Sequence, residues 1–190
     1  MERDVFHRSE RLFLRPPWPE DAAELTRAIA HEPVARMLAR LPWPYTQADA
    51  EFWIGMHRDP MLPGFLLTVP EEGARIVGGV GLQPGPSDAP EVGYWVAPDC
   101  WGRGYATEAL KGLLEVAERL GHQHLFGRHA ADNPASGRVM MKAGFRPTGK
   151  IGRFRSLGRG ESVPAPEYAL DLGEDLSGPA GGDEEFRVAA

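Results

Sequence analysis

The chain has 190 residues, 42% hydrophobic and 25% charged, a composition typical of one soluble globular domain. Its net charge of −6 disfavours nucleic acid as a partner, because binding to phosphates requires a surplus of Lys and Arg. The single cysteine, Cys100, excludes an intramolecular disulfide and any metal site built from cysteines. No apolar run approaches the ~18 residues of a membrane span. The first residues also lack a signal-peptide pattern, so we expect a cytoplasmic protein with no membrane partner.

The first half of the chain predicts two helices and an antiparallel meander. Residues 11–15 alternate between polar and apolar side chains, as in a half-buried strand. A helix is expected from about Glu20. A second helix is expected after Thr46, which has Asp49 three residues further on, as in a capping box. Turn-rich segments separate three further expected strands, at residues 64–69, 76–82 and 91–96.

The second half predicts a strand–helix–strand unit. An apolar stripe at helical spacing indicates a helix over residues 106–120, and a strand is expected at 124–129. Asn133 is placed to cap a further helix with Pro134 at its first position, and a last strand is expected at 167–172. A connection of this length implies a parallel strand pair, so the sheet is mixed and the fold class is α/β or α+β.

The acidic residues are concentrated at the C-terminal end. Residues 173–190 carry a net charge of −4, which leaves the preceding part of the chain at −2. We therefore expect one domain over residues 9–172, followed by an acidic, flexible tail.

The segment WGRGYAT at residues 101–107 is a glycine-rich loop between an expected strand and an expected helix. Backbone amides of such a loop converge on one point, where the helix dipole adds positive potential, so the loop can hold a phosphate or pyrophosphate. A tight turn that binds nothing is the alternative. A dinucleotide-binding loop fits poorly, because the strand at 124–129 (HLFGRH) does not end in an acidic residue.

Two motifs together resemble a known family. WGRGYATEAL at 101–110 and ADNPASGRVMMKAGF at 131–145 are similar to the acyl-CoA-binding core of the GNAT N-acetyltransferase superfamily. The segments at 9–25, 41–54 and 91–98 resemble its ribosomal-protein-alanine N-acetyltransferase-like branch, so the likeness covers about residues 9–172. It implies a single-domain, mostly antiparallel sheet with one parallel, splayed strand pair. It also implies acetyl-CoA as co-substrate, with pantetheine in the gap beside strand 91–96.

The resemblance also implies where the cofactor is held. The loop at 101–106 aligns with the R/Q-x-x-G-x-G/A motif, whose amides bind the pyrophosphate, although Trp101 stands where Gln or Arg is usual. The cofactor-binding residues expected on this basis are Trp95, Val96, Trp101, Gly102, Arg103, Gly104, Tyr105, Ala106, Thr107, Asn133 and Ser136.

Acetyl transfer needs a neutral amine and a proton for the departing thiolate. Glu91, at a sheet position where the superfamily often has a carboxylate, is the candidate base, with an ordinary polar strand start as the alternative. Many relatives use a tyrosine as the acid at the position of Met140, which cannot donate a proton. Ser136 is the candidate acid instead, with a small polar residue in a first helical turn as the alternative. Glu108 is interpreted as a carboxylate that stabilises the helix dipole.

The acceptor is expected to be a primary amine, either a protein N-terminus or a small molecule. Trp43, Tyr45 and Trp53 are candidates for the wall of the acceptor pocket, with a plain core role as the alternative. The histidines show no spacing that suggests a metal site, and the chain is expected to be a monomer or a homodimer. The hypothesis from another class is a regulatory module that binds acyl-CoA without turnover.

Overall fold

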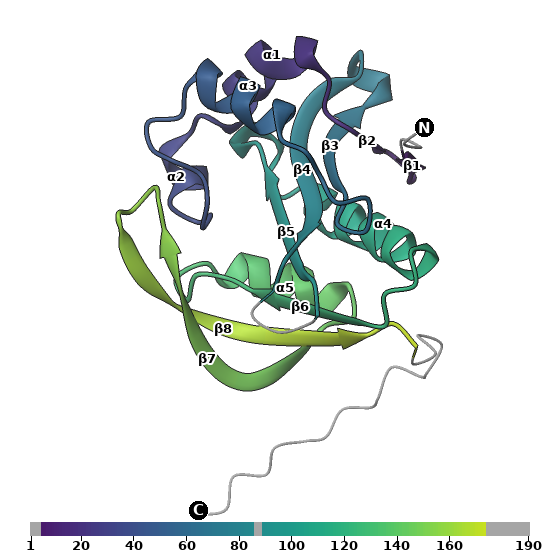
Figure 1. Ribbon diagram of the computed structural model, residues 1–190, viewed down its shortest axis with the longest axis vertical. Helices are drawn as coiled ribbons and strands as arrows, with labels where there is room; N and C mark the ends of the chain where they lie inside the picture. Colours follow the sequence, from purple (N-terminus) through teal and green to yellow (C-terminus); the bar gives the residue numbers. More distant parts are fainter. Residues whose placement is uncertain (1–4, 86–88, 174–190) are drawn as a thin grey trace, which may run out of the picture.

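The computed structural model describes residues 5–85 and 89–173. The acidic tail expected beyond residue 173 lies outside this range. An eight-stranded sheet runs through the molecule in the order β1-β2-β3-β4-β5-β6-β8-β7 (Figure 1). Neighbouring strands are antiparallel, except that β5 and β6 are parallel, which confirms the predicted fold class. The strands are β1 (His7–Arg8), β2 (Phe13–Arg15), β3 (Gly64–Val69), β4 (Arg75–Gln83), β5 (Glu91–Val96), β6 (His124–Arg128), β7 (Arg146–Ser156) and β8 (Glu161–Asp171).

The helices lie on both faces of the sheet. They are α1 (Ala22–Ile29), α2 (Glu32–Ala35), α3 (Gln47–Gly55), α4 (Tyr105–Arg119) and α5 (Pro134–Lys142), with short 3-10 turns at Pro19–Asp21, Pro70–Glu72 and Pro98–Cys100. Thr46 and Asp49 form the predicted capping box at the start of α3. None of the described helices combines the length and apolar character needed to cross a bilayer.

Alternation along the central strands creates two separate cores. In β3, the side chains of Phe65, Leu67 and Val69 pack into the core that contains α4, whereas Leu66 packs into the core of α1 to α3. Full burial of a Leu or Phe side chain contributes about 1.5–3 kcal/mol, so both faces anchor the middle of the sheet. The strands that border the functional site are therefore held from both sides.

Four elements differ most from the sequence prediction. Strands β1 and β7 and the short helix α2 were not expected, and β8 begins six residues before the predicted start at Glu167. Strand β7 is exposed over most of its length, so it lacks the apolar alternation that marks a half-buried strand. It forms by pairing with β8, and the hairpin curves toward α2 (Figure 1).

Candidate active site

The parallel pair β5–β6 is joined at one end only. Glu91 is registered opposite Phe126, and the Phe126 backbone N–H donates to the Pro90 carbonyl at 2.8 Å. No other residue pair joins these two strands in the described chain, whereas β5 pairs with β4 along its whole length. The predicted splay is thus present. A cavity of about 620 Å³ opens there, lined by every residue of β5.

The glycine-rich loop forms one side of this cavity. Gly102 and Gly104 have φ angles of 76° and 82°, a region that favours glycine. Gly104 caps α4, so the amides of the first turn have no acceptor within the helix. Trp101, Gly102, Gly104, Tyr105, Ala106 and Thr107 all line the cavity. Unpaired amides at a helix N-terminus, facing an open cleft, fit an anionic group such as a pyrophosphate.

Two side chains of the loop have partners that the sequence did not reveal. Arg103 is not among the residues that line the cavity, and it forms an ion pair with Glu72 at 3.4 Å. In this arrangement the Arg103 side chain is thus engaged with Glu72, and its contact with a phosphate stays a prediction. Trp101 donates from Nε1 to the Val96 carbonyl at 2.7 Å, which fastens the loop to the end of β5.

Trp95 is positioned by a glycine on the neighbouring strand. It is paired with Gly79 of β4, where an added Cβ would lie 2.5 Å from the indole nitrogen. A side chain at position 79 would push the ring away, so the glycine allows Trp95 to lie against β4 while lining the cavity.

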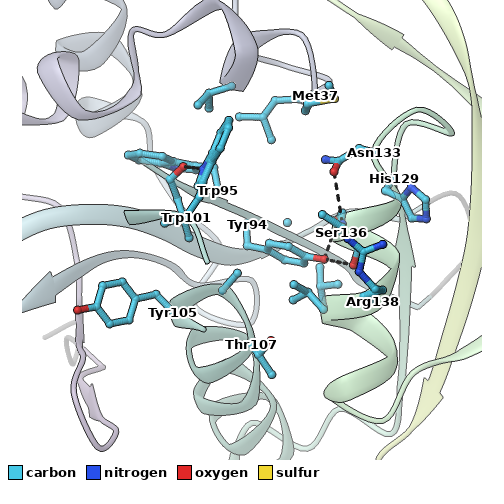
Figure 2. A pocket seen from close by; sticks show the side chains of 18 of the residues that line it. Met37, Tyr94, Trp95, Trp101, Tyr105, Thr107, His129, Asn133, Ser136 and Arg138 are labelled. Carbon is cyan, nitrogen blue, oxygen red and sulfur yellow. Dashed lines mark hydrogen bonds between the residues drawn. The ribbon is translucent and has the colours of Figure 1, made fainter. Parts of the chain in front are cut away.

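Helix α5 forms the opposite side of the cleft. Asn133 is its N-cap, as predicted, and accepts at Oδ1 from the Ser136 backbone N–H at 3.4 Å. Both residues line the cavity. The Ser136 hydroxyl lies 2.7 Å from the Tyr94 hydroxyl, which reaches α5 from β5 across the opening (Figure 2). Tyr94 was missed as a site residue, since no local pattern relates positions 94 and 136.

Glu91 lies at the closed end of the opening. Its side chain lines the cavity and is buried, and its oxygens accept from Arg128 Nε at 3.0 Å and Nη2 at 3.1 Å. Arg128 also donates to the Arg153 carbonyl at 3.1 Å. The candidate base is thus an ion-paired carboxylate rather than an isolated one, and no local sequence pattern indicates Arg128 as its partner.

Apolar residues from segments that were not predicted as elements also line the cavity. Met37 and Leu38, which follow α2, and Phe154 of β7 line the cavity. The hairpin is attached to this segment, because the Leu157 N–H donates to the Ala39 carbonyl at 3.0 Å and Ser156 Oγ to the Leu38 carbonyl at 3.0 Å.

The aromatic residues expected around the acceptor lie elsewhere. Trp43, Tyr45 and Trp53 are absent from the cavity lining. Tyr45 is buried in the core of α1 to α3, where burial and the charge of Asp49 raise its pKa to about 12. Trp53 packs on the same core with the Arg58 guanidinium 4.5 Å from its ring centre, and Trp43 is 41% exposed.

Glu108 and Cys100 have structural partners near the loop. Burial alone would raise the pKa of Glu108, but hydrogen bonds from the Arg11 backbone and side chain and from Ser9 hold it below the usual value. Glu108 does not line the cavity. Cys100 is buried with Sγ 3.1 Å from Arg75 Nη2, and burial raises the pKa of its thiol, which does not favour a nucleophilic role.

Comparison with known proteins agrees with this architecture. The chain is 28% identical over 141 residues to FsC-acetyl coenzyme A-N(2)-transacetylase from Aspergillus fumigatus, a match that covers 67% of this chain and 60% of the fungal protein. The chain thus spans about 60% of the length of that relative.

Two solved structures share the fold. RimJ from Mycobacterium smegmatis, in complex with a CoA-disulfide, superposes with a TM-score of 0.74 at 19% identity, over 92% of this chain and 89% of its own. Ribosomal-protein-S5-alanine acetyltransferase from Vibrio fischeri gives a TM-score of 0.73 at 16% identity, over 90% and 98%. The profile of the family described as acetyltransferase (GNAT) domain matches residues 11–146, well over half of the chain. The chain therefore belongs to the GNAT acetyltransferase family.

Proposed function

We propose that this protein transfers the acetyl group of acetyl-CoA directly to a primary amine, within one complex that holds both substrates. The observation that carries the proposal is the opening between β5 and β6, with unpaired helix amides on one side and the Ser136 hydroxyl on the other. The amides of residues 102–107 hold the pyrophosphate. Pantetheine then follows β5 past Trp95 and Val96, and Asn133 and Ser136 flank its reactive end.

The acceptor enters the part of the cavity lined by Glu91 and Arg128, where the Arg128 guanidinium lies 5.7 Å from the ring centre of Phe154. A free α-amine has a pKa of ~8 and is neutral in about one molecule in ten at pH 7, whereas a lysine side chain is neutral in about one in 2,500. An α-amine, of a protein or a small molecule, therefore needs less help from a base. Glu91 supplies that help through a water, while Arg128 keeps its carboxylate in place.

Ser136 acts when the carbon–sulfur bond breaks. The amine nitrogen bonds to the carbonyl carbon, the electron pair of the broken bond leaves on sulfur, and the serine gives its hydrogen to the sulfur. The proton lost by nitrogen restores the serine hydroxyl through solvent. No covalent acetyl-enzyme forms.

The test is thiol release from acetyl-CoA in the presence of an amine panel. It pairs peptides that have a free N-terminus with the same peptides blocked there, and adds small amines. Release that requires a free amine supports the proposal. Binding of CoA without release for any amine overturns it in favour of the regulatory acyl-CoA-binding module.

Replacing Ser136 tests its role within this reaction. We expect Ser136→Ala to lower kcat by about 10–100-fold, the range of one general-acid contact, with little change in the acceptor KM. Steady-state rates over a range of acceptor concentrations give both constants, and CoA binding serves as the folding control. An unchanged rate of the chemical step in single-turnover measurements removes Ser136 from the reaction.

A further inference from the structure

A second hydroxyl group lies beside Ser136 and comes from the opposite wall of the cleft. Tyr94 Oη donates to the Ser136 carbonyl at 2.8 Å and is 2.7 Å from Ser136 Oγ, where either oxygen could donate (Figure 2). We infer that Tyr94 is a positioning residue for acetyl transfer: its phenol directs the Ser136 hydroxyl hydrogen into the cleft and strengthens it as a donor to the leaving sulfur. This inference rests on the proposed function.

The direction of the Ser136 hydroxyl hydrogen depends on where the single hydroxyl hydrogen of Tyr94 is donated. The phenol has one hydrogen, and two Ser136 oxygens are within its reach. If the phenol donates to the backbone carbonyl, the serine hydroxyl must turn its own hydrogen toward Tyr94 to keep the 2.7 Å contact. If the phenol donates to Oγ, the serine hydrogen is free to point at a ligand in the cleft. A sulfur that accepts from Ser136 favours the second arrangement.

Tyr94 keeps its own proton throughout the reaction. Burial raises the pKa of Tyr94 to about 12; the hydrogen bond with Ser136 lowers it somewhat and the charge of Tyr168 adds to the rise. The phenol therefore stays protonated, and able to donate, near neutral pH. As Ser136 passes its hydrogen to sulfur, Oγ gains negative charge, and a hydrogen bond to a charged oxygen is stronger than one to a neutral oxygen. Tyr94 thus stabilises the transition state more than the ground state.

Neither His129 nor Met140 offers an alternative proton donor at this place. His129 lines the cavity, but its Nδ1 donates to the Ala130 carbonyl at 2.8 Å and its Nε2 accepts from Tyr168 at 3.2 Å. Met140, at the position where relatives have a tyrosine, is 1% exposed and packs in the core.

The test is a double-mutant cycle of Tyr94→Phe and Ser136→Ala, with kcat, KM and CoA affinity measured for each protein. We expect Tyr94→Phe to lower kcat about tenfold, the loss of one hydrogen bond made in the transition state, with CoA affinity within about twofold of the wild type. In the Ser136→Ala background, the same change should have no further effect on kcat. Tyr45→Phe removes another buried phenol, in the core of α1 to α3 and outside the cavity lining, and should leave kcat unchanged.

Each outcome has one meaning. Equal losses from Tyr94→Phe with and without Ser136 overturn the inference, as does an unchanged kcat in Tyr94→Phe or in Ser136→Ala. A wild type that binds CoA but releases no thiol contradicts the proposed function itself. If Tyr94→Phe does not fold, site-specific difluorotyrosine keeps the ring but makes the phenol more acidic. The fall of kcat at high pH should then begin at a lower pH than in the wild type, and an unmoved profile overturns the inference.

Discussion

A negative charge at Thr107 should weaken binding of CoA without weakening the fold. Thr107 is the third residue of α4 and lines the cavity beside the loop. An aspartate at this position lies near the positive end of the helix dipole, an interaction that stabilises the folded state by about 0.3–1 kcal/mol. The unliganded Thr107→Asp variant should therefore unfold at the wild-type temperature or slightly above it. Gly104 is a poorer choice, because its φ of 82° would mix backbone strain with electrostatics.

The same aspartate repels a bound pyrophosphate. Two like charges 4 Å apart repel by about 1 kcal/mol in water and about 4 kcal/mol at an effective dielectric constant of 20, so ~2 kcal/mol is reasonable at a cleft surface. That penalty weakens affinity about 30-fold. At a CoA concentration of about 100 times the wild-type Kd, ligand stabilisation falls from about 2.7 to about 0.9 kcal/mol.

Thermal unfolding with and without CoA measures this difference directly. A stabilisation of 2.7 kcal/mol raises the Tm by about 5–11 °C for a chain of this size, and 0.9 kcal/mol by about 2–4 °C. Thr107→Asn is the matched control, since it has nearly the same shape without the charge, and should keep most of the wild-type shift. An equal CoA-dependent shift in the Asp and Asn variants refutes the placement of the pyrophosphate at this loop.

Two further predictions concern buried ion pairs. Glu91→Gln should lower kcat/KM at pH 7, with recovery above about pH 9 as the amine loses its proton unaided. Arg128→Gln should lower the Tm, because it leaves the buried Glu91 carboxylate without its cationic partner. A uniform loss at every pH in Glu91→Gln means that Glu91 orients the acceptor instead. Asp21 accepts two hydrogen bonds of 2.7 Å from Arg15. Asp21→Asn should therefore lower the free energy of unfolding by about 3 kcal/mol at pH 7. Burial raises the pKa of Asp21, but its hydrogen bonds with Arg15 and Trp18 and the charge of Arg15 hold the pKa below its usual value. The stabilisation by this carboxylate is therefore lost as the pH falls through the lowered pKa. In urea unfolding, the difference in unfolding free energy between wild type and variant should be smaller at pH 3 than at pH 7.

Local patterns were sufficient for short strands between turn residues and for a helix cap. The strands at 64–69 and 91–96 and the cap at Asn133 match the structure residue for residue, because the turn residues that bound a strand and the residue that caps a helix are properties of short segments. The loop at 101–107 was recognisable for the same reason. It combines glycines with a following amphipathic helix.

Long-range pairing accounts for what could not be predicted. Strand β7 contains Pro147, Gly149 and Gly152 and is exposed over its first six residues, so its pairing with β8 makes this segment a strand. The pairs Glu91–Arg128 and Tyr94–Ser136 join residues from different elements, and neither partner indicates the other. For the aromatic residues of 43–53, spacing favours a core role without deciding it for each one: Tyr45 is buried in the core of α1 to α3, whereas Trp43 and Phe52 are exposed.

The splay of β5 from β6 explains why the phenol of this site comes from a strand. Helix α5 lies so close to β6 that a Cβ on Gly127 would be 2.6 Å from the Met140 sulfur, so position 140 fills the core. Strand β5 is joined to β6 only at Glu91, and three residues further on Tyr94 has no neighbouring strand on that side. Its side chain can therefore cross the gap and reach Ser136. We propose that this opening admits the thioester. The same opening allows the Tyr94 hydroxyl of β5 to lie within hydrogen-bonding distance of the Ser136 hydroxyl of α5.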